Sequence, residues 1–448
     1  MKDILRNPAL LFVIAGIAII IIMILYNALA KNRKIAHNGE KFILGTFLTA
    51  ISGATGVTLA PLSKLYLPIL LNNATTPPTV ISMTLIYFSF FLLLVPRFRY
   101  TLNKMLKSII ITLMISNPFL GLLLSMIVVS FSWSIVPDSS FKASLIIVAT
   151  TLVAIYVAQE YTWQEIYPVW RWVNFIVVIA SIIKPNAGDD GNWTGILGHK
   201  NQFSFFMAQS AVLWFLNGFY YPKERRMSIV IGLLSVVCLQ KGGSGASKIL
   251  TVVLIGLFCY LSVVKKLPVR WAFVSVVVFL ILSICLSIVV INNIEFIVVD
   301  TLNKDLTITG RTDFWPQIVD KINLQPILGY GVNGFWRSDL GLDNPARGIM
   351  IAKSLFVPPH SHNGYLDLAT ELGWLGLTLY IIAYFVNLAK GVVYLTQDSL
   401  PEAGIPIFIL TYQLMTNLTE TGLFGCNSNW FWFVALTARL GYDTMGKR

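Results

Sequence analysis

Apolar runs separated by short polar loops make up most of this chain, and one long polar segment interrupts them at about 300–373. Many runs reach the roughly 20 residues that an α-helix needs to cross a hydrocarbon core about 30 Å thick. They are continuous rather than alternating, which predicts membrane helices and not the strands of a membrane barrel. The pattern therefore predicts an all-α polytopic membrane protein.

We expect about 12 to 14 transmembrane helices from these runs. Pro61 and Pro68 leave the stretch 61–76 open as a further crossing or a re-entrant piece. The predicted spans lie at about 8–30, 42–60, 79–96, 109–134, 143–159, 168–184, 202–221, 227–240, 247–264, 271–297, 374–396, 404–424 and 428–442.

The polar segment divides the predicted architecture into three parts. An N-terminal helix bundle occupies 1–297, a large extracytoplasmic loop with short helices occupies 298–373, and C-terminal helices occupy 374–448. We find no internal repeat. The first apolar run is too long for the apolar core of a signal peptide and is predicted to be a span.

Composition supports a membrane protein and excludes a soluble one. Of 448 residues, 56% are hydrophobic and 12% are charged, and the mean hydropathy is +0.72. The four cysteines have no spacing typical of a metal site or a disulfide framework. They are Cys238, Cys259, Cys285 and Cys426.

The net charge of +12 comes largely from basic residues in short loops, mainly 97–104, 222–226 and 265–270. Such loops are typical of the cytoplasmic side of a membrane protein, with some contact to lipid headgroups, so nucleic-acid binding is not indicated. This orientation places the polar stretches 186–204 and 241–248 outside, together with the long loop. The orientation of the first spans is left open.

His362 is the leading candidate for chemistry, in the sequence PPHSHNGYLDL. We expect Asn363 to cap a following helix that carries Asp367 and Glu371 on one face and that Gly373 can end. The positive end of that helix disfavours a charged imidazole, and a neutral histidine is what a general base or hydroxyl acceptor must be. The alternative is an exposed or structural histidine.

Two cations are candidates for binding an anion. Arg311 precedes an apolar-periodic stretch that predicts a short amphipathic helix lying against the membrane, where arginine can bridge a phosphate. It can equally pair with Asp313 or a bulk lipid. Lys248 follows a Gly-rich turn at the start of a span; it can bind an anionic group or simply extend to the interface.

Further polar residues extend this candidate site. His199 and Lys200 precede a span that Asn201 is expected to cap, and Glu420 lies at or near the end of a penultimate span. Arg337 and Arg347 add positive charge to the long loop. Excess cations with one suitable base and no metal-ligand spacing predict an anionic substrate such as a diphosphate, handled without a metal.

Five motifs in this order resemble the O-antigen ligase/polymerase superfamily. They are HKN before a span, a Ser-Lys pair at a span entrance, G-R-x-x-x-W, PILGYGVNGF, and H-N-G-Y-L-D-L-x-x-E-L-G-W-x-G, from about 193 to 377. The resemblance implies a GT-C-like membrane glycosyltransferase in the bacterial inner membrane. Its active site would face the periplasm and use neither a metal nor another cofactor.

The same resemblance implies the reaction and its residues. A glycan passes from a polyprenyl (undecaprenyl) diphosphate to an acceptor sugar hydroxyl, with inversion. His362 corresponds to the essential histidine and Arg311 to the arginine of the GR motif. Lys248 stands where the family usually has a second arginine. Lysine keeps the charge but loses the bidentate fork.

Several functions remain open within and beyond this resemblance. We favour polymerisation of O-antigen or exopolysaccharide repeats, as in the exopolysaccharide polymerase branch, over ligation to lipid A core. Chain-length regulators or export proteins are candidate partners. A flippase for lipid-linked glycans would place its polar groups near the bilayer midplane, and a scaffold subunit would use the loop for docking.

Overall fold

The computed structural model describes residues 33–53, 98–188, 190–292, 310–350 and 358–445. These residues form helices and loops with no β-strand, which confirms the predicted all-α class. The chain divides into two units, Met1–Lys107 and Ser108–Arg448, and each is considered by itself. The first contributes α2 (Arg33–Ile51) and most of α5 (Phe98–Ile110).

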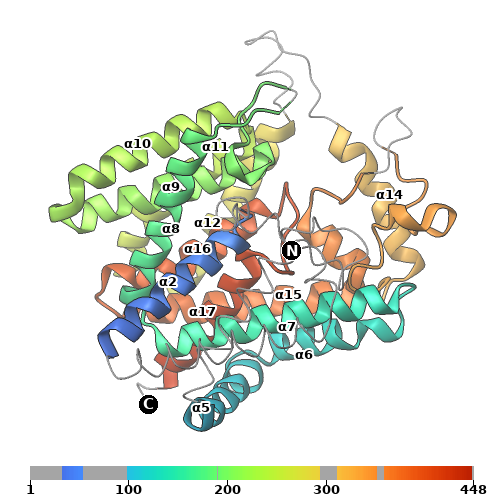
Figure 1. Cartoon of the computed structure of the whole chain (residues 1–448), viewed down its shortest axis with the longest axis horizontal. Coiled ribbons are helices and arrows are strands. Elements are labelled where there is room, and N and C mark those ends of the chain that lie inside the picture. The colour runs from blue at the N-terminus through green and yellow to red at the C-terminus, as the bar shows by residue number, and fades with distance from the viewer. Residues whose placement is uncertain (1–32, 54–97, 189, 293–309, 351–357, 446–448) are drawn as a thin grey trace, which may run out of the picture. The chain divides into compact units, whose positions relative to one another are not determined.

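The second unit contains the remaining long helices and the long polar segment (Figure 1). Its helices are α6 (Pro118–Val129), α7 (Pro137–Glu160), α8 (Trp163–Ile183), α9 (Lys200–Tyr220), α10 (Arg225–Gly242), α11 (Gly245–Val264), α12 (Val269–Asn292), α14 (Gly310–Leu324), α15 (Gly364–Gln397), α16 (Ile405–Thr416) and α17 (Ser428–Met445).

Five described helices are long and apolar enough to cross a membrane: α7, α8, α11, α12 and α15. A sixth crossing is obtained if the bent pair Asn103–Ser116 and Pro118–Ser132 counts as one span. The predicted spans at 8–30 and 79–96 lie outside the described residues. A multi-pass membrane protein is confirmed, whereas the number 12 to 14 stays a prediction.

One predicted span is wrong in shape. The run 109–134 does not form a continuous helix, because its two halves meet at 110°. Asn117 leaves the helical conformation (φ −148°, ψ 83°), and its side chain accepts a hydrogen bond from the amide of Leu120 to cap α6. Pro118 occupies the first turn of the new helix, where a missing N–H costs nothing.

The predicted span 404–424 is also wrong in length, since α16 ends at Thr416. Asn417 Nδ2 donates to the carbonyl of Gln413 at 2.8 Å, and Gly422 and Gly425 have φ values of 146° and 125°. Local side-chain bonds to the backbone and left-handed glycines both favour a loop over a continued helix. Glu420 therefore lies in a loop between α16 and α17.

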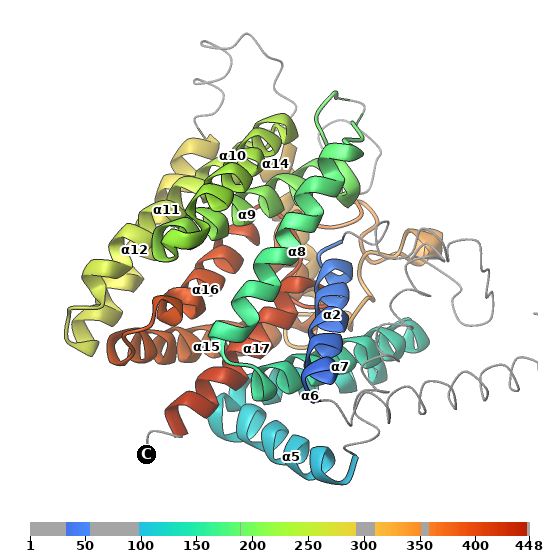
Figure 2. The same ribbon diagram turned by 60° about the vertical axis from the view of Figure 1, so that its left-hand side comes forward.

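Helix packing in the second unit brings distant parts of the chain together. The helix α9 packs against α10 and α11, α11 packs against α16, and α15 packs against α6 and α14 (Figures 1 and 2). As a result, α9 and α16 are both neighbours of α11, and α15 also packs against α16. The loops at the ends of these helices can therefore meet.

The helix predicted after Arg311 is present as α14, but it does not face lipid with its apolar side. Phe314, Ile318 and Ile322 are fully buried. They pack in a core with Phe335, Ala346, Ile349 and Ala369. Amphipathic periodicity shows that one face must be covered, and here protein covers it instead of membrane.

The Gly-rich sequence LGYGVNG (328–334) is a structural turn. Gly329 and Gly331 have φ values of 64° and 82°, which favour glycine. The amides of Tyr330 and Gly331 donate to the carbonyls of Thr370 and Glu371, each at 2.9 Å. The turn thus holds the long loop against α15 beside Gly373, where the predicted helix break occurs (φ 65°, ψ −175°).

Candidate functional site

The candidate site is built around the start of α15, where Asn363 is the N-cap, as predicted. Its Oδ1 accepts from the amides of Tyr365 and Leu366 at 3.0 and 3.2 Å. His362, just before the cap, has a left-handed conformation with φ 54°. This is uncommon for a residue with a side chain and points to a locally imposed geometry. The HSHN segment (360–363) is thus a turn fixed by capping.

His362 faces Glu420 from the loop after α16. The distance from His362 Nδ1 to Glu420 Oε2 is 3.6 Å. Asn201 Nδ2, from the first turn of α9, donates to Glu420 Oε1 at 2.6 Å. Asn201 is therefore not the cap of α9, a position that His199 occupies without a side-chain bond. Three separate parts of the chain meet at one carboxylate.

The backbone also holds these segments together. The amide of Gly364 donates to the carbonyls of Asn417 at 2.9 Å and Glu420 at 3.0 Å. A Cβ at Gly364 would lie 2.3 Å from Asn417 Oδ1, so the close approach requires glycine. The loop after α16 is thereby fixed on the first turn of α15.

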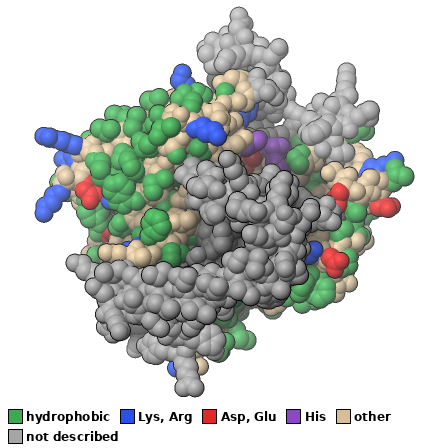
Figure 3. All heavy atoms as spheres, in the orientation of Figure 1, with side chains coloured by type: hydrophobic (Ala, Val, Ile, Leu, Met, Phe, Trp, Pro, Cys, Tyr) green, Lys and Arg blue, Asp and Glu red, His purple; other side chains and the backbone are tan. Residues whose placement is uncertain are grey.

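Three of the four histidines share this site. The rings of His360 and His362 lie 4.1 Å apart, and the amide of His362 donates to His360 Nδ1 at 3.2 Å. Burial lowers the pKa of His360. The neighbouring His362 and His199 lower it further, whereas the carboxylates of Asp367 and Glu420 oppose the shift. Histidine surface lies beside acidic surface in Figure 3. His360 is accordingly disposed to be neutral.

Asp367 supports the HSHN segment from inside α15. Its side chain is 6% exposed, and Oδ1 accepts from the Trp336 indole at 2.8 Å and the Ser361 amide at 3.0 Å. Within the described residues, Asp367 Oδ2 and His362 Nδ1 are buried without a hydrogen-bond partner. Buried polar groups are normally satisfied, so open ones are informative about function.

Arg311 lies in the first turn of α14, and its side chain and that of Asp313 are outside the described residues. One turn later, the indole of Trp315 donates to the carbonyl of Ser361 at 2.9 Å. The helix that carries Arg311 is thus held to the HSHN segment through Trp315.

Lys248 is exposed in the first turn of α11, and its side chain has no hydrogen bond or ion pair among the described residues. A small apolar cavity separates its helix from the end of α16. This cavity is lined by Ala246, Ile249, Ser287, Met415, Leu418 and Thr419. Lys248 therefore lies in a segment that is next to the loop containing Glu420.

The predicted polar segments 186–204 and 241–248 also meet. The amide of Trp193 donates to the carbonyl of Lys241 at 2.9 Å. A Cβ at Gly243 (φ 71°) would lie 2.2 Å from Asn192 Oδ1. Together with the Asn201–Glu420 bond and the Glu420–His362 contact, these contacts bring all three polar segments to one end of the helices.

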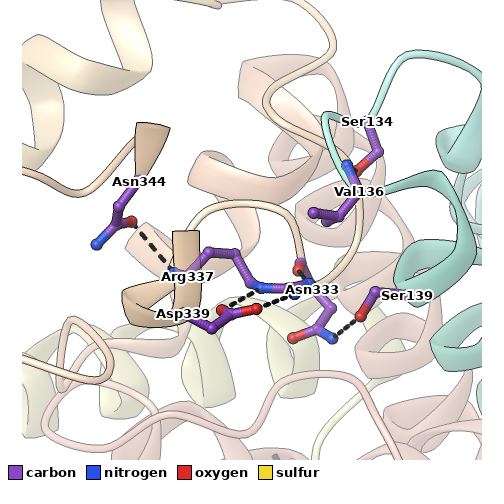
Figure 4. Close-up of polar contacts among 7 residues, drawn as sticks. All are labelled: Ser134, Val136, Ser139, Asn333, Arg337, Asp339 and Asn344. Atoms are coloured by element: carbon purple, nitrogen blue, oxygen red, sulfur yellow. Dashed lines mark hydrogen bonds and ion pairs between the residues drawn. The ribbon is translucent and has the colours of Figure 1, made fainter. Parts of the chain in front are cut away.

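Two predicted cations are already paired with carboxylates. Lys200 forms an ion pair with Asp190, and this contact and Asn192 lower the pKa of Asp190 to about 2. Arg337 pairs with Asp339 through two bonds of 2.8 and 2.5 Å, which raises the pKa of Arg337 and lowers that of Asp339 (Figure 4). Arg347 is exposed.

The expected substrate-binding role of these basic residues stays a prediction. The bond from Asn201 to Glu420, and those from Trp336 and Ser361 to Asp367, were not predicted from the sequence. Only the HKN motif hinted at Asn201. Among the described residues, no group of three or more His, Cys, Asp or Glu side chains could hold a metal ion.

The fold and the site define a polytopic helical membrane protein with a cluster of histidines and carboxylates at one end of its helices. Residues 228–381 match the family described as O-Antigen ligase. The chain is also 24% identical over 232 residues to the exopolysaccharide production protein ExoQ of Rhizobium meliloti (strain 1021), covering 48% of this chain. It spans about half (51%) of the length of that curated relative.

These matches confirm the expected resemblance of the chain to the O-antigen ligase/polymerase superfamily. The family match contains Lys248, Arg311, Arg337, Arg347 and His362. It does not extend to His199, Lys200, Asn201 or Glu420, although the structure brings Asn201 and Glu420 to His362.

Proposed function

We propose that this protein is a membrane glycosyltransferase that moves a glycan from a polyprenyl diphosphate carrier to the hydroxyl of an acceptor sugar. The observation that carries the proposal is the meeting of His362, Glu420 and Asn201 at the start of α15. Around it lie a lowered-pKa histidine and the helices that present Arg311 and Lys248. A base beside available cations suits attack on a sugar diphosphate.

In this reaction the acceptor oxygen attacks the anomeric carbon as the bond from that carbon to the diphosphate oxygen breaks. His362 takes the hydroxyl proton, and Glu420 at 3.6 Å stabilises the resulting imidazolium. A positioned general base contributes about 10²–10⁴-fold to rate. Direct displacement forms no covalent enzyme intermediate and inverts the anomeric configuration.

The leaving diphosphate gains negative charge as the bond breaks. Arg311 and Lys248 are the residues proposed to stabilise that charge, and no metal or other cofactor is required for this role. Removal of one preorganised donor of this kind typically costs about 3 kcal/mol of transition-state stabilisation. His199, Lys200, Arg337 and Arg347 extend the positive surroundings, of which Lys200 and Arg337 are partly neutralised.

Polymerisation is the favoured activity because the matched relative is an exopolysaccharide production protein. Ligation to lipid A core is the second candidate, because the matched family carries the description O-Antigen ligase. In both cases we place the protein in a bacterial inner membrane with the site facing the periplasm. The basic loops 222–226 and 265–270, at the opposite helix ends, support that orientation.

The test is gel analysis of surface glycans in a strain that lacks this protein. Loss of long chains with retention of single repeats is expected for a polymerase. Long carrier-linked chains with bare core would indicate a ligase instead. Accumulation of the carrier-linked repeat in the cytoplasmic leaflet would contradict both transferase assignments and indicate a flippase.

A further inference from the structure

A second cavity lies at the other end of the same helices, far from the histidine cluster. Its walls include Leu213 of α9, Leu254 and Leu257 of α11, and Phe408 of α16. The space between protein atoms is about 760 Å³, including the open mouth.

Helix geometry separates this cavity from the candidate active site. The helix α9 begins at Lys200 beside the histidine cluster and ends at Tyr220, which lines the cavity. At 1.5 Å per residue its 21 residues extend about 30 Å, the thickness of a hydrocarbon core. Likewise α11 runs from Lys248 to the lysines after Val264. The two sites therefore correspond to opposite leaflets.

Two groups of opposite charge also line this apolar cavity. Lys265 follows α11 and has no side-chain partner among the described residues. Glu402, only 4% exposed, also lines the cavity. Its Oε1 accepts a hydrogen bond from the Tyr221 hydroxyl, whereas Oε2 is buried with no partner within the described part.

The nearby buried arginine does not satisfy Glu402. Arg171 is 4% exposed and pairs with Glu224 at 2.7 Å, and its guanidinium lies 4.7 Å from the centre of the Trp214 ring. One carboxylate oxygen of Glu402 thus remains for a ligand that can donate a hydrogen bond.

We propose that this cavity binds one phospholipid with a primary ammonium headgroup, a phosphatidylethanolamine. An acyl chain occupies the apolar space, the phosphate contacts Lys265, and the ammonium donates to Glu402. A buried carboxylate disfavours an anionic headgroup, and a choline headgroup has no N–H to donate. Lys265 and Glu402 in one cavity match a zwitterionic headgroup, whose phosphate pairs with the lysine and whose ammonium pairs with the carboxylate.

The test uses the full-length protein in detergent, delipidated and then offered equal amounts of phosphatidylethanolamine, phosphatidylglycerol and phosphatidylcholine. Native mass spectrometry reads the lipid retained. We expect several-fold preferential retention of phosphatidylethanolamine. Equal retention of all three lipids means that bulk lipid fills the cavity, and it would overturn the proposal, as would preference for phosphatidylglycerol.

Variants separate the headgroup from the tail. Glu402→Gln can still accept from Tyr221 but loses the negative charge, so the preference for phosphatidylethanolamine should vanish while a lipid is still retained. If Glu402→Gln cannot be purified, Lys265→Gln is the alternative variant. It should lower retention of all three phospholipids. Unchanged preference in Glu402→Gln, or unchanged retention in Lys265→Gln, would contradict the assignment.

A cavity-filling pair tests the tail. Leu257→Trp occupies the cavity and should reduce retention of every lipid, whereas Leu282→Trp, at a position 63% exposed on α12 and outside the cavity lining, should not. Equal retention in both would exclude the cavity as the binding place. These results are independent of the proposed transferase reaction, because no residue of the histidine cluster is changed.

Discussion

The HSHN segment and the segment 326–346 belong to one polar stretch, yet their polar groups are used differently. Around the HSHN segment, His362 Nδ1 and Asp367 Oδ2 are buried and have no hydrogen-bond partner among the described residues. In the segment 326–346, Arg337 and Asp339 bind each other, and the amides of Tyr330 and Gly331 bind backbone carbonyls. Under the proposed function the first segment contributes groups that meet the substrate, whereas the second holds the long loop against α15.

Among variants that keep His362, the largest effect is expected where the unpaired cation Lys248 is removed. Lys248→Gln should lower glycan transfer by roughly 100-fold, because a donor to the leaving diphosphate contributes about 3 kcal/mol. Lys248→Arg should retain most activity. The measurement is product formed by membranes with equal protein content, with exposed Lys142→Gln of α7 as the matched control. An active Gln variant with an inactive Arg variant would refute an anion-binding role.

A smaller loss is expected for Glu420→Gln. The amide can still accept from Asn201, but the charge that stabilises a protonated His362 is gone. We expect transfer to fall about 10-fold, equivalent to roughly 1.4 kcal/mol. The pH profile of the rate should shift, whereas Asp343→Asn, an exposed loop carboxylate, should leave the profile unchanged. An unshifted profile for Glu420→Gln would separate Glu420 from the base.

His360 makes stability depend on pH. Its folded pKa lies below the usual 6.5, so the unfolded chain binds more protons in the window below pH 6.5. The contribution of His360 to the free energy of unfolding is therefore fully present above pH 6.5 and is lost as the pH falls below it. The melting temperature should drop by a few degrees more between pH 7 and 5 in the wild type than in His360→Gln. Identical pH dependence would show that His360 titrates normally.

The smallest effect is expected in the segment 326–346. Arg337→Gln removes a partner of Asp339, which is 40% exposed at its side chain, and such pairs contribute about 0–1 kcal/mol. Transfer should stay within about threefold of wild type, with a small decrease in melting temperature. Loss of product at an unchanged melting temperature would instead place Arg337 at the substrate.

Much of the fold followed from apolar runs, but their direction in space did not. Pro118 was visible in the sequence, whereas the 110° break needed the conformation of Asn117 as well. The periodicity of Phe314, Ile318 and Ile322 predicted one covered face of α14. Periodicity does not distinguish lipid from Phe335 and Ile349 as the cover.

The local part of the site was predictable and the long-range part was not. The cap at Asn363 and the break at Gly373 follow from neighbouring residues. The Asn201–Glu420 bond joins positions 219 apart, and Trp336 and Asp367 are 31 apart. Such pairs depend on how α9, α15 and α16 pack. The pattern of apolar and polar residues in one sequence does not specify that packing.

The most direct test of the account is transfer by the His362→Ala variant. Membranes with wild-type or variant protein at equal level would be supplied with the polyprenyl diphosphate-linked repeat, and product chain length would be followed over time. Loss of the base should slow transfer by roughly 10²–10⁴-fold, while Lys142→Ala stays at wild-type rate. Polymer of normal length formed at the normal rate by His362→Ala would contradict the central claim.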